Sequence, residues 1–150
     1  MITIVPYEPA HWAGIEKVHD TARRQELAYA GLDGAFLPLS VAAQQEDLFA
    51  YSLFVAKQDE DVAGFVAFTE DELAWLYVHP ACQRQGIGRA LAEFALSKMA
   101  PGEKCVEVLA GNETARNLYR SLGFSGEVLL HGRMPGNEKY EVSVWRMTMK

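Results

Sequence analysis

Short apolar runs recur along the chain and predict seven strands, several of them with the alternating pattern of a half-buried sheet. They lie at about residues 2–6, 53–57, 62–69, 73–78, 105–109, 124–131 and 141–149. Four stretches with helical spacing lie between them, at about 10–29, 39–48, 85–100 and 112–122. The order β-α-α-β-β-β-α-β-α-β-β predicts a mixed sheet with helices on both faces.

Two of the predicted helices carry a well-defined apolar face. The face of the first helix holds Ile15, Val18, His19, Ala22 and Leu27. The face of the third helix holds Ile87, Ala90, Leu91, Phe94 and Ala95. Pro101-Gly102 is expected to end the third helix, and Gly123 has the position of a left-handed C-cap after the fourth. Both faces are therefore expected to pack against the sheet.

Composition narrows the class of protein. A length of 150 residues favours one domain, residues 1–150, with an ordinary soluble composition of 49% apolar and 23% charged residues. The net charge of −6 argues against nucleic acid as the main partner. No apolar run is long enough to span a membrane, and the first residues do not resemble a signal peptide, so a cytoplasmic location is expected.

Cysteines and histidines give no sign of a metal site or a disulfide framework. The two cysteines, Cys82 and Cys105, form no CxxC pair, and the four histidines lack ligand spacing. We interpret Cys82 as a small semi-buried residue rather than as a reactive thiol. No metal is therefore expected.

The most informative stretch is the turn Gln-Arg-Gln-Gly-Ile-Gly at 83–88, between the strand at 73–78 and the third helix. Two glycines at a helix start let the backbone approach a ligand, and the free N–H groups there carry a partial positive charge that binds phosphate. Arg84 and Arg89 would add charge-assisted hydrogen bonds. A nicotinamide-type fingerprint does not fit, because Leu91 stands where a third glycine is needed, and no Walker lysine follows. The stretch predicts a pyrophosphate cradle.

A second block follows about 25 residues later, with Asn112, Ala115, Leu118-Tyr119 and Gly123-Phe124. Together with the glycine turn and the flanking strands, it resembles the GNAT superfamily of acyl-CoA-dependent N-acyltransferases over roughly residues 53–130. The resemblance implies an α+β sandwich whose mostly antiparallel sheet splays between its fourth and fifth strands. It also implies acetyl transfer from acetyl-CoA to a primary amine by direct attack.

The resemblance assigns specific roles to the residues of these two blocks. Backbone groups of Leu76, Tyr77 and Val78 would hold the pantetheine arm of the cofactor, and an N–H there would stabilise the thioester oxyanion. The pyrophosphate would be held by Arg84, Gln85, Gly86, Ile87, Gly88 and Arg89. Asn112 would hydrogen-bond the cofactor arm, although its position also suits a helix N-cap. Tyr119 would donate a proton to the departing thiolate, although its helical stripe also suits core packing.

The base that receives the proton of the amine has two candidates besides ordered water. Glu107 lies in a strand between apolar neighbours, where burial would raise its pKa towards a useful value. It also resembles, by its distance from Asn112, the glutamate base of ribosomal-protein N-terminal acetyltransferases in this family. Glu72, at the start of the fourth strand, is the alternative, with a solvated turn charge as its simpler interpretation. Glu107 is therefore the first candidate.

The acceptor is the part that the sequence defines least. Its groove is expected between the first two helices and the last hairpin, whose side chains suit a small-molecule or peptidic amine with an apolar body. The candidates are Trp12, Tyr29, Phe36, Phe49, Tyr51 and Trp145, with Glu26, Asp33 and Asp47 as amine partners. The turn-rich loop at 131–139 would either overhang this site or join a homodimer. A non-catalytic acyl-CoA-binding sensor or partner-binding module, which needs no acid at position 119, is the alternative function.

Overall fold

The computed structural model describes all residues, Met1–Lys150, and contains a seven-stranded sheet in the order β1-β2-β3-β4-β5-β7-β6. All neighbouring strands are antiparallel except β4 and β5, which are parallel. The strands are β1 (Ile2–Pro6), β2 (Ser52–Gln58), β3 (Asp61–Phe68), β4 (Glu72–Val78), β5 (Lys104–Leu109), β6 (Gly126–Met134) and β7 (Asn137–Met149). The predicted mixed, mostly antiparallel sheet is confirmed.

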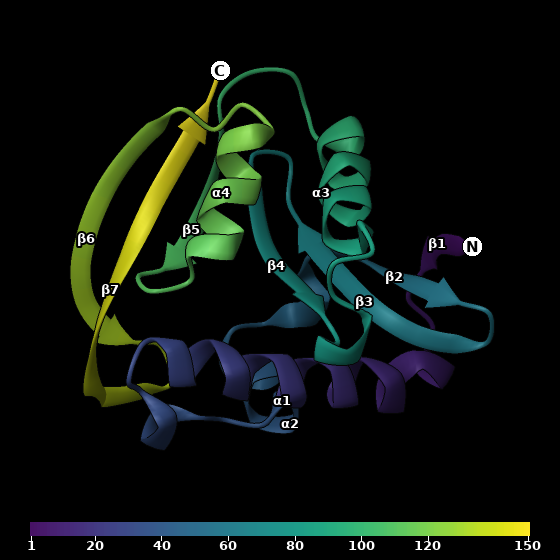
Figure 1. The fold of residues 1–150 in the computed structure, drawn as a ribbon, viewed down its shortest axis with the longest axis horizontal. Coiled ribbons are helices and arrows are strands. Elements are labelled where there is room, and N and C mark those ends of the chain that lie inside the picture. Colours follow the sequence, from purple (N-terminus) through teal and green to yellow (C-terminus); the bar gives the residue numbers. More distant parts are fainter.

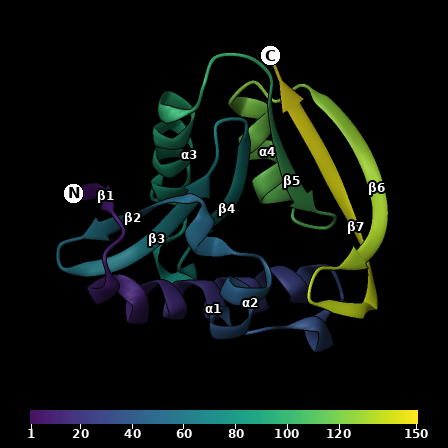
Figure 2. The ribbon, with the colours of Figure 1, turned by 180° about the vertical axis from the view of Figure 1, so that it is seen from behind.

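Four α-helices cover the sheet (Figures 1 and 2). They are α1 (Trp12–Tyr29), α2 (Leu39–Gln45), α3 (Ile87–Lys98) and α4 (Glu113–Ser121). Helices α3 and α4 lie on one face and α2 on the other, whereas α1 runs across the end of the sheet where β4 finishes (Figure 1). None of these helices combines the length and the hydropathy that a bilayer-crossing segment needs.

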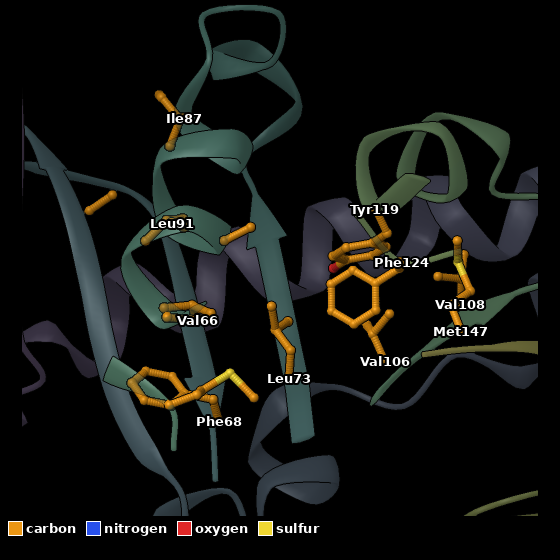
Figure 3. Packing of buried hydrophobic residues seen from close by; sticks show 14 of the residues in the cluster. Val66, Phe68, Leu73, Ile87, Leu91, Val106, Val108, Tyr119, Phe124 and Met147 are labelled. Carbon is orange, nitrogen blue, oxygen red and sulfur yellow. The ribbon is translucent and has the colours of Figure 1, made fainter. Parts of the chain in front are cut away.

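Each face of the sheet buries its own apolar cluster. Under α3, Leu91 lies near Val66, and under α4, Phe124 lies beside Val106 (Figure 3). On the other face, Ile15 of α1 packs with Leu39 of α2. Full burial of one such side chain stabilises the fold by about 1.5–3 kcal/mol. All five residues predicted for the buried face of α1 are buried.

The parallel contact between β4 and β5 is short. It pairs Glu72 with Cys105 and Leu73 with Val106, and the two strands then diverge (Figure 1). Beyond Leu73, β5 pairs only with β7, so the edge of β4 that faces β5 is left open. This is the predicted splay, and it lies between the two faces that carry the helices.

The expected loop at 131–139 is wrong, because β6 and β7 extend to a turn at Pro135-Gly136, with one irregularity in their pairing between Arg133 and Met134. Such two-residue turns favour a glycine in the left-handed region, and Gly136 has a φ of 74°. The polar residues at 131–139 suggested a loop although most of them lie in strands. Most of β6 is exposed, so this strand shows no apolar alternation in the sequence. The tip packs onto the helices instead, where the Asn137 amide donates to the Ala35 carbonyl oxygen at 3.1 Å.

Candidate active site

The open edge of β4 presents unpaired backbone groups to the splay. The His79 N–H donates to the Ala63 carbonyl oxygen at 2.9 Å, towards β3. Because alternate residues of an antiparallel strand point their backbone groups to opposite sides, Tyr77 also faces β3, whereas Leu76 and Val78 face the open edge. Of the three residues predicted to offer backbone groups to the cofactor arm, Leu76 and Val78 are therefore placed to do so, and the Tyr77 backbone is used in the sheet.

A cavity of about 370 Å³ lies between this edge, the N-termini of α3 and α4, and α1. We call it the α3 cavity. All ten predicted cofactor-binding residues except Gln85 line it, and so does Cys82. Gln85 lies beside the cavity and accepts a hydrogen bond from the Gln58 amide at 3.0 Å. The residues that the sequence singled out on β4, in the glycine turn and at the start of α4 thus line one cavity.

The glycine turn has the backbone of an anion-binding turn. Arg84 and Gly86 both have positive φ angles, 66° and 80°, and such turns direct N–H groups to one side. The first intrahelical bond of α3 runs from the Ala90 N–H to the Gly86 carbonyl oxygen. No side chain caps the helix, so the N–H groups of its first turn are available to a ligand. A phosphate at this place would complete the cap.

Gly88 and the two arginines fit the same ligand. A Cβ on Gly88 would meet protein atoms only at 3.7 Å and beyond, so packing within the protein does not require a glycine. A ligand close to the backbone does require one. Arg84 makes no ion pair within the protein, whereas Arg89 donates to the Ser121 hydroxyl and lies 3.9 Å from Glu93. The donor set therefore suits the diphosphate of acetyl-CoA, with Arg84 as its free cation.

Tyr119 combines a buried ring with an available hydroxyl. The ring is 5% exposed and packs edge-on against Phe124, with centroids 5.7 Å apart. Its hydroxyl points towards β4 (Figure 3), makes no hydrogen bond within the protein, and lines a small cavity of about 70 Å³ in the splay. Burial, followed by the charge of Glu26, raises the pKa of the Tyr119 phenol well above its ordinary value. The ring packs in the core, as one interpretation of the sequence expected, and the hydroxyl faces the splay, where its role as an acid stays a prediction.

Asn112 also does two things. Its Oδ1 accepts a hydrogen bond from the Ala115 N–H at 3.2 Å and caps α4. Its Nδ2 donates to Glu26 Oε2 at 2.7 Å, which joins α4 to α1. An amide nitrogen carries two hydrogens, so one donor remains for a ligand in the α3 cavity that Asn112 lines.

Glu107 differs from the expectation of a buried carboxylate. Its side chain is 45% exposed and lies 3.4 Å from Arg146, its cross-strand neighbour on β7. The prediction of burial is wrong because Glu107 lies on the face that carries α1 and α2, and these helices do not cover the middle of β5. Glu107 nevertheless borders the splay cavity. Glu72 does not, and burial, together with the charge of Glu107, raises the pKa of Glu72.

A further cavity of about 200 Å³ lies on the face that carries α1 and α2, and we call it the α1 cavity. One stripe of α1 lines it with His19, Arg23 and Glu26. Glu26 is one of the carboxylates expected as amine partners, whereas Arg23 was not expected here; its signal in the sequence is a charge four residues after the apolar-face residue His19. Met134 and Pro135 bring the hairpin tip to the same cavity.

The α1 cavity lies between the first two helices and the last hairpin, where the acceptor groove was expected, but the aromatic lining expected for it is wrong. None of its six aromatic residues lines the α1 cavity, and neither do Asp33 and Asp47. Its aromatic wall comes from β4 instead, through Trp75 and Tyr77. The Trp145 ring lies on the other face of the sheet, with the Arg116 guanidinium 3.6 Å above its centre.

The splay joins the cavities on the two faces. Glu26 and Tyr77 are the two residues that border the α3 cavity, the α1 cavity and the splay cavity together. The α3 cavity and the α1 cavity therefore approach each other at Glu26 and Tyr77, beside the splay cavity that Tyr119 lines. No group of three or more His, Cys, Asp or Glu side chains is placed to hold a metal ion.

The splay beside the glycine turn suits an acyl-CoA-dependent N-acyltransferase. The family model described as "Acetyltransferase (GNAT) domain" matches residues 50–126, and the chain therefore belongs to the GNAT acetyltransferase family. The predicted family, fold and enzyme class are confirmed, with acetyl-CoA as the co-substrate.

Individual relatives come from bacteria. The peptidyl-lysine N-acetyltransferase YjaB of Salmonella typhimurium is 34% identical over 95 residues, which are 59% of this chain and 64% of that protein. The ribosomal protein bS18-alanine N-acetyltransferase of Escherichia coli is 34% identical over 101 residues, 63% of this chain and 68% of the relative. The alignment thus spans slightly less than two thirds of the first relative and slightly more of the second.

Solved structures share the whole fold. The crystal structure of the ribosomal-protein-S18-alanine N-acetyltransferase from Escherichia coli has a TM-score of 0.74 and 25% identity, over 99% of this chain and 93% of that one. A GCN5-related N-acetyltransferase from Rhodopseudomonas palustris has a TM-score of 0.78 at 20% identity, over 99% and 94% of the two chains. The second likeness concerns the fold alone.

Proposed function

We propose that the protein transfers the acetyl group of acetyl-CoA to a primary amine of a peptide, by direct attack of the amine on the thioester. The observation that carries the proposal is the position of the Tyr119 hydroxyl. It has no partner in the protein and faces a splay that is reached from cavities on opposite faces of the sheet. In this proposal acetyl-CoA enters through the α3 cavity, the amine enters through the α1 cavity, and both react beside Tyr119.

The residues on the α3 side suit the binding of acetyl-CoA, which supplies the reactive thioester. The first turn of α3 and Arg84 bind its diphosphate, and the free donor of Asn112 binds its arm. An N–H of Leu76 or Val78 stabilises the negative charge that develops on the thioester oxygen. These groups are fixed in the fold before the ligand binds, so little reorganisation opposes the reaction.

The proton transfers follow from the groups around the splay. The acceptor ammonium loses one proton to a base, and its nitrogen then forms the C–N bond while the C–S bond breaks. Tyr119 donates its proton to the departing thiolate and recovers one from the nitrogen, so each turnover releases one proton. Because burial raises the pKa of its phenol, Tyr119 stays protonated at neutral pH and can act as the acid.

Glu107 is the base in this proposal, directly or through one water molecule. Its carboxylate borders both the α1 cavity and the splay cavity, whereas Glu72 borders neither. Its ion pair with Arg146 lies at the surface and is open to solvent on the side of the α1 cavity. A proton taken up by Glu107 can therefore leave to water after each turnover.

A peptidic acceptor fits the α1 cavity. With a volume of about 200 Å³ and both apolar and charged side chains in its walls, the cavity admits one residue of a peptide rather than a folded surface. The two curated relatives are named for a peptidyl-lysine and for the alanine of a ribosomal protein. We therefore expect a free N-terminal amine or a lysine amine as the acceptor. A homodimer and a cytoplasmic location stay predictions.

Three peptides of one sequence test the proposal. The first has a free N-terminal alanine and no lysine, the second an acetylated N-terminus and one lysine, and the third has both amines blocked. Each is incubated with the protein and acetyl-CoA while release of the CoA thiol and the peptide mass are followed. We expect acetylation of the first or second peptide and none of the third. Stabilisation by CoA in a thermal melt, without turnover of either free amine, would instead indicate a non-catalytic acyl-CoA-binding module.

A further inference from the structure

Glu26 occupies the place where the three cavities join. It lies near the C-terminal end of α1, with its side chain 16% exposed. It is the one carboxylate that borders the α3 cavity, the α1 cavity and the splay cavity together. Glu107 borders only two of them and is 45% exposed. A carboxylate at the junction is within reach of both substrates.

Neighbouring donors fix the orientation of this carboxylate. Arg23 Nη1 donates to Glu26 Oε1 at 2.6 Å, and the Tyr77 hydroxyl donates to the same oxygen at 3.5 Å. Asn112 Nδ2 donates to Oε2 at 2.7 Å. A carboxylate has about four acceptor positions on its two oxygens, so at least one on Oε2 remains for a ligand. Oε2 is the oxygen on the side of α4, and therefore on the side of the splay.

The charges around the α1 cavity favour a cation. Three carboxylates line it, those of Glu26, Glu46 and Glu107, against one guanidinium, that of Arg23. Arg23 is paired with Glu26, and Arg146 is paired with Glu107, so no positive charge there is left free. The excess negative charge of the cavity is that of Glu46. Glu26 and Tyr119 also line the same splay cavity of about 70 Å³, so the carboxylate lies near the phenol. An ammonium at Glu26 would thus lie near the acid.

We propose that Glu26 holds the acceptor amine, through a hydrogen bond from the amine nitrogen to Oε2, and aims that nitrogen at the thioester. This assignment rests on the proposed function. Glu26 of α1 binds and orients the amine, and Glu107 of β5, or water, removes its proton. Binding and deprotonation of the amine are thus assigned to different groups. Arg23 and Asn112 are the positioning residues that hold Glu26. Because Asn112 touches the α3 cavity as well, it links the amine-binding carboxylate to the bound cofactor.

The test compares Glu26→Gln and Glu26→Asp with Glu16→Gln, which removes the same charge from the same helix at a residue that lines none of the three cavities. The peptide that the wild type acetylates is the substrate. We expect Glu26→Gln to raise its KM about 10- to 100-fold, the usual effect of losing a hydrogen bond between charged groups. The dissociation constant of acetyl-CoA should stay within about threefold of the wild type. Glu26→Asp should recover part of the loss, and Glu16→Gln should behave as the wild type.

Three other outcomes overturn the assignment in distinguishable ways. An active wild type and a Glu26→Gln variant with an unchanged peptide KM would remove Glu26 from amine binding and leave the proposed function intact. A rise in the acetyl-CoA dissociation constant and a lower melting temperature, with an unchanged peptide KM, would show a structural role only. A wild type that acetylates neither free amine would overturn the proposed function, and this assignment with it.

Discussion

The side-chain amide of Asn112 donates a hydrogen bond to the Glu26 carboxylate at 2.7 Å, and so joins the N-cap of α4 to α1 across the mouth of the splay. The same side chain caps α4 through its oxygen. One residue therefore fixes the helix that carries the proposed acid and the carboxylate that we assign to the acceptor amine.

Two substitutions at position 112 separate these contributions. Asn112→Ser keeps a good cap and loses the bond to Glu26, whereas Asn112→Ala loses both. Because an N-cap contributes about 1 kcal/mol, we expect Asn112→Ala to be about 1 kcal/mol less stable than Asn112→Ser in urea unfolding. Equal stability of the two variants would show that the cap contributes nothing.

Gly86 and Gly88 are expected to respond in opposite ways to alanine. Gly88 lies inside α3 with space for a Cβ, so Gly88→Ala should stabilise the fold by up to about 1 kcal/mol. Gly86 has a φ of 80°, so Gly86→Ala should destabilise it by about 1–2 kcal/mol.

Binding of acetyl-CoA then shows whether Gly88 serves the ligand. The added methyl group of Gly88→Ala stands where the diphosphate is expected, so the dissociation constant should rise about tenfold, or about 1.4 kcal/mol. Calorimetric titration measures it. A more stable Gly88→Ala variant that binds acetyl-CoA as tightly as the wild type would place the diphosphate elsewhere.

The two candidate bases can be compared by the same chemical change. Glu107→Gln should lower kcat by about 10²-fold, the lower end of what a general base contributes. Glu72→Gln should leave kcat within about twofold of the wild type, because Glu72 borders neither cavity of the acceptor. Steady-state rates at saturating acetyl-CoA and peptide test this. The reverse result would assign the base to Glu72, and no effect of either change would assign it to water.

His19 predicts a pH dependence of stability. It is 2% exposed, and burial lowers the pKa of its imidazole despite the hydrogen bond to Asp20 and the charge of Glu26, while Arg23 lowers it further. The unfolded chain, with an imidazole pKa of about 6.5, therefore takes up a proton before the folded one does. The free energy of unfolding should fall as the pH drops below about 6.5, and His19→Phe should remove that part of the fall. Parallel pH curves for the two proteins would contradict this.

Much of this architecture could be predicted from the sequence because its signals are local. The glycine turn and the stripe of α1 follow from backbone freedom and helical period, and the structure places both as expected. The strands at 126–134 and 137–149 extend further towards their turn than predicted, because β6 is an edge strand whose side chains are mostly exposed and need not alternate. An exposed ribbon gives little hydrophobic signal.

The acceptor side could not be predicted, because it depends on residues that are distant in the sequence. Glu26 and Asn112 lie 86 positions apart and meet only through the fold. The exposure of Glu107 depends on how far α1 and α2 extend over β5, which no local pattern encodes. Trp75 and Tyr77 line the α1 cavity because alternate side chains of β4 point to the same face of the sheet. The sequence had indicated β4 only as a strand whose backbone binds the cofactor.

The proposed mechanism places the reaction in the splay, and Tyr119→Phe tests that placement directly. The hydroxyl makes no hydrogen bond in the protein, so its removal should leave the melting temperature and the dissociation constant of acetyl-CoA almost unchanged. The measurement is the single-turnover rate of peptide acetylation at saturating acetyl-CoA. We predict a loss of about 10²-fold or more, as expected for a general acid. A rate equal to that of the wild type would contradict the role of the Tyr119 hydroxyl as the acid of the reaction.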